Sequence, residues 1–274
     1  MTMKKKKLNK SQGKTKGKTK SKKKKISNLI LIFLVCVEII AMVNIVKIIS
    51  GYYKDQSSYD KIAEMASATK FTGVIDFDEL AKVNSDIVAW IYLEDSKINY
   101  PVVQGSDNDT YLKTKFDGSY GGAGTIFADY RINQPFEEFY TMLYGHHMRD
   151  GSMFAVLKHY KSSDYAKEHG RLEVITPTAK YHMEVVGFIQ CKDDSDLYVM
   201  DQSATTYDKL IRSSLKYGTD VEWTTDDKLV LLSTCAYDYD NARYILVGKL
   251  VPWTEEEIRK AEFIQIKLNN QKNN

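Results

Sequence analysis

Residues 229–251 read LVLLSTCAYDYDNARYILVGKLV. The apolar run 229–232 is followed by a short polar segment, and a second apolar, β-branched run begins at Arg243. Two such runs separated by turn-forming residues predict neighbouring strands. Cys235 then ends the first strand and Arg243 begins the second. This arrangement places a thiol and a guanidinium on neighbouring strand ends, at the mouth of a sheet rather than inside it.

Short segments of similar composition recur from residue 87 onward. They are short, rich in β-branched and aromatic residues, and separated by Gly, Asp and Asn, which is typical of strands. The predicted strands are 87–93, 100–104, 124–127, 139–144, 171–176, 180–190, 228–233 and 244–251. Eight such runs predict a mainly β fold with a closed or nearly closed barrel. Segments 76–83, 152–160 and 204–217 are predicted helices because their apolar residues fall at helical spacing.

The charge of the chain is divided sharply between its two ends. Of the 39 Lys and Arg, 13 lysines lie in residues 1–25, which contain no acid; the remaining 26 bases face 36 acids, a net of −10. The lysine-rich tail has almost no apolar residue and is predicted to be disordered. Such a tail could bind nucleic acid, but the apolar segment that follows it argues against that function.

Residues 26–49 are dominated by Leu, Ile, Val, Phe and Met. A helix of this length would be about 36 Å long, enough to span a bilayer with some tilt. Glu38, near its centre, costs a few kcal/mol in a membrane, on the order of 3. A cleaved signal peptide is the alternative, because the uninterrupted apolar run 29–37 has the length of an h-region. The lysine tail would stay in the cytoplasm, so the acidic body would lie outside.

A second polar cluster lies far upstream of Cys235, at residues 143–154, LYGHHMRDGSMF. A thiol, an imidazole and a guanidinium on one exported domain predict nucleophilic thiol chemistry with an oxyanion stabiliser. Residue chemistry alone does not rank His146 above His147. Cys235 as a buried apolar side chain and the two histidines as metal ligands are the alternatives. Adjacent histidines do not easily chelate one ion, and no further His/Cys cluster has ligand spacing, so neither a metal nor an organic cofactor is predicted.

An ordered set of motifs resembles the sortases, the membrane-anchored cysteine transpeptidases of Gram-positive bacteria, and most of all their class B branch. The set comprises Thr234-Cys235 with Arg243, Tyr144-Gly145-His146, residues 150–154 (DGSMF), 86–91 (DIVAWI), 98–105 (INYPVVQG), 107–108 (DN), 111–112 (YL) and 127–131 (FADYR). The resemblance covers roughly residues 77–253, most of the chain. Each motif alone is weak evidence, whereas their order along the chain is specific.

The resemblance implies an eight-stranded sortase-type β-barrel with peripheral helices, preceded by a transmembrane helix. It implies that Cys235 is the nucleophile, His146 the acid and base, and Arg243 the oxyanion stabiliser. The implied substrate-binding residues are Asn108, Leu112, Tyr144 and Ser233. The implied domains are a cytoplasmic tail (1–25), a signal anchor (26–49), a helical stalk (50–70), an extracellular catalytic domain (71–254) and a C-terminal helix or tail (255–274).

The implied reaction cleaves a C-terminal sorting signal on a secreted protein and transfers the protein to a peptidoglycan amine. Two other functions remain open. A papain-like thiol hydrolase would deliver the acyl group to water, but its Cys precedes its His and starts a helix, unlike Cys235. A non-catalytic, membrane-tethered peptide-binding module would not need the thiol at all.

Overall fold

The computed structural model describes residues 13–68 and 71–272. The chain divides into two compact units, Met1–Gly51 and Tyr52–Asn274. Helix α1 (Gly13–Met65) supplies the described part of the first unit and the beginning of the second. The prediction of a disordered tail is wrong for residues 13–25, which are helical. Lysine is a good helix former, and a helix that is already nucleated in the apolar segment extends without a new nucleation cost. Residues 1–12 lie outside the described residues.

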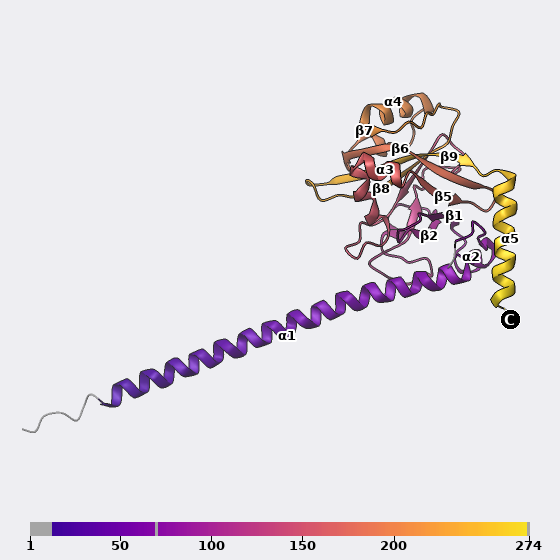
Figure 1. The fold of residues 1–274 in the computed structure, drawn as a ribbon. Coiled ribbons are helices and arrows are strands. Elements are labelled where there is room, and N and C mark those ends of the chain that lie inside the picture. The colour runs from indigo at the N-terminus through magenta and orange to yellow at the C-terminus, as the bar shows by residue number, and fades with distance from the viewer. Residues whose placement is uncertain (1–12, 69–70, 273–274) are drawn as a thin grey trace, which may run out of the picture. The chain divides into compact units, whose positions relative to one another are not determined.

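Within the described ranges of the second unit, nine strands form one sheet, and eight of them close into a barrel (Figure 1). The strands are β1 (Ile87–Tyr92), β2 (Asn99–Val103), β3 (Ile126–Ala128), β4 (Tyr140–Tyr144), β5 (Arg171–Ile175), β6 (Lys180–Lys192), β7 (Leu215–Gly218), β8 (Leu229–Cys235) and β9 (Ala242–Pro252). Their order is β5-β1-β2-β3-β4-β8-β9-β6, and a β5–β6 pairing closes the ring. The pairs β2–β3 and β4–β8 are parallel, and the other pairs are antiparallel. The predicted barrel of eight strands is confirmed.

The barrel wall separates two hydrophobic cores, which explains why β8 is apolar on both faces. Val230 and Leu232 belong to the main core, whereas Leu229 and Leu231 belong to a second core that α4 helps to cover. Side chains alternate between the two faces of a strand, so a strand buried on both faces reads as a continuous apolar run. The same alternation puts Cys235 on the face of Leu231, where it is the first residue of β8 that is not buried.

Helix α4 (Ala204–Ser214) begins at Ser203, whose hydroxyl accepts a hydrogen bond from the Thr206 N–H. The prediction of a helix over 204–217 is wrong at its C-terminal end, because residues 215–218 form β7 and pair with β6. Gly187 of β6 permits this pairing, since a Cβ there would lie 2.5 Å from the Tyr217 carbonyl oxygen. Leu215 fits a helical apolar pattern as well as a strand, so periodicity alone does not separate the two.

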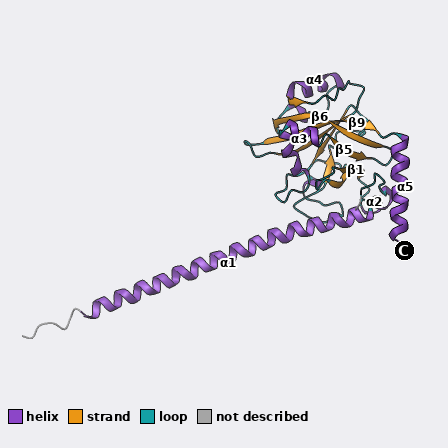
Figure 2. Cartoon of the chain, in the orientation of Figure 1, coloured by secondary structure: helices purple, strands orange, loops and turns teal. Residues whose placement is uncertain are grey.

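The remaining helices surround the barrel (Figure 2). They are α2 (Phe77–Val83), η1 (Thr110–Leu112), η2 (Phe154–Lys161), α3 (Ser163–Glu168), η3 (Asp196–Tyr198) and α5 (Glu255–Lys272), where η denotes a 3-10 helix. The helix predicted over 152–160 is thus a 3-10 helix that begins at Phe154. At the end of α1, Tyr59 and Ile62 are buried in the main core, and the Tyr59 hydroxyl donates to the Gly124 carbonyl. This part of α1 therefore belongs to the packed body of the second unit.

Candidate active site

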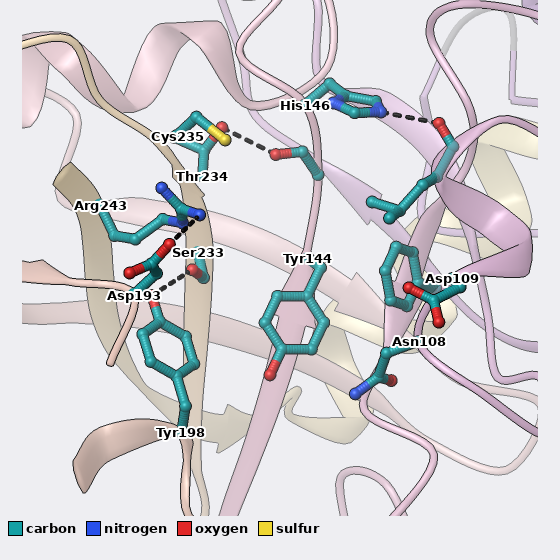
Figure 3. Close-up of a pocket in the computed structure, with 13 residues that line it drawn as sticks. Asn108, Asp109, Tyr144, His146, Asp193, Tyr198, Ser233, Thr234, Cys235 and Arg243 are labelled. Atoms are coloured by element: carbon teal, nitrogen blue, oxygen red, sulfur yellow. Dashed lines mark hydrogen bonds and ion pairs between the residues drawn. The ribbon is translucent and has the colours of Figure 1, made fainter. Parts of the chain in front are cut away.

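The strand ends around Cys235 enclose a pocket of about 510 Å³. This volume lies within the range of small-ligand sites. Its wall comprises Asn108, Asp109, Leu112, Phe127, Tyr144, Gly145, His146, Asp193, Tyr198, Ser233, Thr234, Cys235 and Arg243 (Figure 3). All seven residues singled out from the sequence are in this set. The parallel pairing of β4 with β8 brings the two distant motifs together, because Tyr144 is the register partner of Ser233.

Cys235 is a partly exposed, free thiol at the end of β8. Two hydrogen bonds continue the β4–β8 alignment beside it. The Gly145 N–H donates to the Ser233 carbonyl at 3.1 Å, and the Thr234 hydroxyl donates to the Gly145 carbonyl at 2.7 Å. The main chain on both sides of the thiol is therefore held in place while the side chain stays open to the pocket.

His146 follows directly after Gly145 and lines the same pocket. Its Nε2 lies 2.7 Å from the Leu112 carbonyl oxygen, so Nε2 carries a proton and donates it. The other ring nitrogen lies on the Cys235 side of the view in Figure 3. The glycine before His146 is needed because a Cβ there would lie 2.6 Å from the ring of Phe154. The partner that orients the imidazole is thus a backbone carbonyl and not a carboxylate.

His147 is absent from the pocket wall, but it contacts the main chain of Cys235. Its Nδ1 lies 2.9 Å from the Cys235 carbonyl oxygen, to which it donates. Its ring packs against Tyr237 and Tyr244 at centroid distances of 5.2 Å and 6.4 Å. The two adjacent histidines therefore differ in place: His146 faces the pocket, and His147 holds the main chain of Cys235.

Arg243 is the register partner of Cys235 in the antiparallel β8–β9 pair, so both side chains are on one face of the sheet. Its Nη2 lies 3.1 Å from Asp193 Oδ2. Asp238 and Asp240 lie just before Arg243 in the sequence, but neither is its ion-pair partner. Asp238 instead accepts hydrogen bonds from Lys161 and Tyr244. Arg243 Nη1 donates to the Ala242 carbonyl at 2.9 Å, and the side chain lines the pocket with 25% of its surface exposed.

The other wall of the pocket carries the residues to which the resemblance assigned substrate binding. Asn108 and Leu112 lie before and within η1, and Tyr144 ends β4. Ser233 is buried, and its hydroxyl lies 2.8 Å from the hydroxyl of Tyr198. Burial raises the pKa of Tyr198, so this phenol stays neutral. The pocket therefore combines an apolar side at Leu112 with hydroxyl and amide groups of fixed orientation.

Six wall residues were not singled out as site residues from the sequence: Asp109, Phe127, Gly145, Asp193, Tyr198 and Thr234. Phe127 occurs in the motif FADYR (127–131), so the sequence did contain an indication of its place at the site. Asp193 and Tyr198 follow β6 and reach the pocket only through the β6–β9 register, which no local pattern reveals. Cys191 and Cys235 are both free thiols, and burial raises the pKa of Cys191.

Within residues 13–68 and 71–272, no group of three or more His, Cys, Asp and Glu side chains is arranged to hold a metal ion. One described helical segment, 28–65, is long and apolar enough to cross a membrane by length and composition.

Comparisons with known proteins cover the barrel and the whole pocket. A family model described as "Sortase domain" matches residues 91–251. The chain is 32% identical to Sortase B of Staphylococcus aureus over 238 residues, which are 80% of this chain and 97% of that protein. It is also 32% identical to Sortase B of Listeria monocytogenes over 194 residues, 68% and 79% of the two chains. A solved Staphylococcus aureus sortase B–substrate complex matches with a TM-score of 0.66 at 27% identity, covering 74% of this chain and 98% of that one.

Proposed function

Because the chain belongs to the sortase family and is a class B cysteine transpeptidase, we propose that it acts on a C-terminal sorting signal. The signal would be carried by a secreted protein, and the acceptor would be an amine of a peptidoglycan precursor. One observation carries the proposal: the thiol, imidazole and guanidinium picked out from the sequence line one pocket of about 510 Å³.

In the first half of the proposed reaction, the Cys235 thiolate attacks the carbonyl carbon of the scissile peptide bond. A carbon–sulfur bond forms, and the carbonyl oxygen becomes an oxyanion that the Arg243 guanidinium stabilises. The tetrahedral intermediate collapses as the carbon–nitrogen bond breaks. His146 gives a proton to the departing amine, which leaves a thioester on Cys235.

The second half runs the same steps in reverse with a different amine. The acceptor amine loses a proton to His146 and attacks the thioester carbonyl. A new amide bond forms, and the Cys235 thiolate departs. Because Nε2 of His146 donates to the Leu112 carbonyl, Nδ1 is the nitrogen left to exchange protons with both amines. A fixed backbone partner suits this role, since it orients the ring without adding a second titrating group.

The wall formed by Asn108, Leu112, Tyr144 and Ser233 would bind the sorting signal beside the thiol. Leu112 offers apolar contact, whereas the other three offer polar atoms. Leu112 also accepts the His146 hydrogen bond through its carbonyl oxygen. A peptide that contacts the Leu112 side chain would therefore lie close to His146, the proposed acid and base.

The proposed location is a membrane, crossed once, with the catalytic unit on the extracellular face. The segment 28–65 is long and apolar enough to cross a membrane, and the lysine-rich residues precede it. Lysines flanking a span favour the cytoplasmic side. The proposed order is tail 1–25, span 26–49, stalk 50–70, catalytic domain 71–254 and C-terminal helix or tail 255–274.

The test uses the full-length protein in detergent micelles, a library of peptides of sorting-signal type, and mass spectrometry of the intact protein. We expect a thioacyl adduct on the wild type that disappears in Cys235→Ala and whose acyl chain passes to an added amine. Cys191→Ala is the matched control, since it removes the other thiol of the second unit and should leave the adduct unchanged.

Two results would contradict the proposal and identify its rival. An adduct that yields only hydrolysed peptide, whatever amine is offered, would indicate a thiol hydrolase. Saturable peptide binding without an adduct, equal in wild type and Cys235→Ala, would indicate a peptide-binding module.

A further inference from the structure

A fully buried carboxylate, Asp129, lies directly behind the substrate wall of the pocket. Asp129 follows β3, and its N–H donates to the Met142 carbonyl of β4 at 3.0 Å. Its side chain has no exposed surface and does not line the pocket. A buried charge is costly unless it is paired and hydrogen-bonded, so its partners show what the arrangement holds in place.

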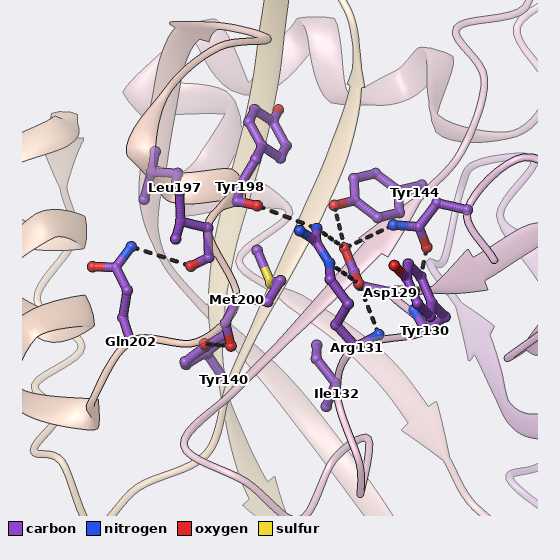
Figure 4. Close-up of polar contacts among 12 residues, drawn as sticks. Asp129, Tyr130, Arg131, Ile132, Tyr140, Tyr144, Leu197, Tyr198, Met200 and Gln202 are labelled. Atoms are coloured by element: carbon purple, nitrogen blue, oxygen red, sulfur yellow. Dashed lines mark hydrogen bonds and ion pairs between the residues drawn. The ribbon is translucent and has the colours of Figure 1, made fainter. Parts of the chain in front are cut away.

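Five hydrogen bonds satisfy the Asp129 carboxylate (Figure 4). Oδ1 accepts from the Arg131 N–H at 3.0 Å and from Arg131 Nε at 2.8 Å. Oδ2 accepts from Arg131 Nη2 at 2.6 Å, from the Tyr144 hydroxyl at 2.8 Å and from Asn108 Nδ2 at 3.0 Å. Burial would raise the pKa of Asp129, but the Arg131 and Tyr144 bonds outweigh it and hold that pKa below its usual value. Asp129 is therefore an anion with two pocket residues attached to one oxygen.

The Asp129 bond fixes which way the Asn108 amide points. Nδ2 must face the carboxylate, because only the NH₂ group can donate to it. Oδ1 then accepts from the Tyr130 N–H at 3.2 Å. One N–H and one lone pair of Asn108 remain for a ligand in the pocket. Without the carboxylate, the amide could rotate and exchange its donor for its acceptor.

Asp129 similarly fixes the Tyr144 hydroxyl. The hydroxyl proton is committed to Oδ2, and burial together with the Asp129 charge raises the pKa of Tyr144, so the phenol stays protonated. A ligand therefore meets only the lone pairs of this oxygen. Tyr144 would offer an acceptor, whereas a free tyrosine hydroxyl offers either role.

Arg131 extends the network to Tyr198, which contacts Ser233. Its Nη2 lies 3.2 Å from the Tyr198 carbonyl oxygen, and the Tyr198 hydroxyl lies 2.8 Å from the Ser233 hydroxyl. The Asp129–Arg131 pair thus touches Asn108, Tyr144 and the segment of Tyr198, three residues that line the pocket from different elements.

We propose that Asp129, together with Arg131, is a positioning residue that orients Asn108 and Tyr144 for peptide binding and leaves the bond-making groups untouched. This inference rests on the proposed function, because it takes the pocket ligand to be a peptide. Asp129 sets the donor and acceptor pattern that the peptide meets, so its loss weakens binding more than it slows the chemical step.

The first test is Asp129→Asn in the full-length protein, with KM and kcat measured for peptide transfer. We expect KM to rise about tenfold, as for the loss of one well-made hydrogen bond in a buried site, while kcat changes less than about threefold. In an Asn108→Ala background the same change should have a much smaller effect on KM, because coupled residues are not additive. Equal effects in both backgrounds would overturn the inference.

Asp55→Asn is the matched structural control. Asp55 is a mostly buried acid 3.7 Å from the buried Lys115 amine, and neither residue lines the pocket. The Asp55→Asn variant should have a lower thermal stability than the wild type and an unchanged KM. If Asp129→Asn lowers stability and leaves KM unchanged, as Asp55→Asn should, then Asp129 is structural only. If Asp129→Asn does not fold, the pair Asp129→Asn/Arg131→Gln removes both charges of the ion pair and carries the same KM prediction.

Peptide affinity measured in a Cys235→Ala background separates this inference from the proposed function. Weaker binding after Asp129→Asn would support the positioning role even where the wild type transfers no acyl group. Undiminished binding after Asp129→Asn, in a protein whose wild type forms the thioacyl adduct, would overturn the positioning role alone. Absence of any peptide binding would overturn both.

Discussion

Two histidines of the second unit show the difference between a pocket and a densely hydrogen-bonded cluster. His146, in the pocket, is partly exposed, and its ring has one hydrogen bond, to the Leu112 carbonyl. His182, on β6, is 7% exposed, with Nδ1 2.8 Å from Glu173 and Nε2 3.0 Å from Glu257 and 2.8 Å from Arg171. Its ring also stacks on Trp253 at a centroid distance of 5.3 Å. We call Arg171, Glu173, His182, Trp253 and Glu257 the helix-docking cluster.

The helix-docking cluster joins the first turn of α5 to the barrel, and both nitrogens of its histidine are engaged. The pocket histidine keeps one nitrogen free. A side chain whose donors and acceptors are all paired contributes to stability, whereas a proton-transfer group must keep an atom for the substrate. The arginines differ in their place: Arg171 bonds Glu173 within the cluster, and Arg243 bonds Asp193 at the pocket.

The largest effect is expected from His146→Gln. Gln retains an N–H for the Leu112 carbonyl but cannot exchange protons near neutral pH. We expect kcat to fall about 10²- to 10⁴-fold, with the free energy of unfolding changed by less than about 1 kcal/mol. Single-turnover peptide transfer measures the loss of catalytic rate, and thermal unfolding measures the change in stability. A variant that lost stability and activity in proportion would place His146 with His182 as a structural residue.

Arg243→Lys should have the next largest effect. Lysine retains the positive charge but lacks the planar fork, so the oxyanion loses an oriented donor and kcat should fall about 10²-fold. Arg171→Lys is the matched control, and its kcat should equal that of the wild type. Asp193→Asn tests whether the ion pair matters, and an exposed pair of this kind is worth only about 0 to 1 kcal/mol. Equal losses of kcat for the two lysine variants would remove Arg243 from the mechanism.

His182→Gln should give the opposite result to His146→Gln. The substitution removes the imidazole from a nearly buried position between two carboxylates and an arginine. We expect the free energy of unfolding to fall by about 1 to 3 kcal/mol, while kcat and KM stay within about twofold of the wild type. Denaturant titration and peptide transfer, done on the same preparation, check this. A selective loss of kcat would show that the cluster communicates with the pocket.

The smallest effect is expected on the stability of the fold at acid pH, through Glu257. The N–H and hydroxyl of Thr254, followed by His182, lower the pKa of Glu257 from 4.5 to about 2. A lowered carboxylate pKa stabilises the fold above the unfolded value, and that contribution is lost as the pH falls from about 4.5 towards 2. The stability difference between wild type and Glu257→Gln should therefore shrink over that range. A constant difference would show that the charge of Glu257 is not what docks α5.

Much of the barrel and of the pocket was predictable because their signals are local. A strand buried on both faces leaves a continuous apolar run, as at 229–232, and β8 ends three residues beyond that run, at Cys235. The motif order then assigned Cys235, His146 and Arg243, and these three line one pocket. Strand β7 was missed because four residues are too few to distinguish a strand from the end of a helix.

The kinds of reactive group at the site were determined by the sequence itself, because residue identity alone supplies a thiol, an imidazole and a guanidinium. The partners of those groups were decided only by the tertiary structure. Asp193 reaches Arg243 across 50 residues, and Asp129 joins Asn108 to Tyr144. Such contacts depend on strand register and barrel closure, which set distances between residues far apart in the chain and leave no periodicity in the sequence.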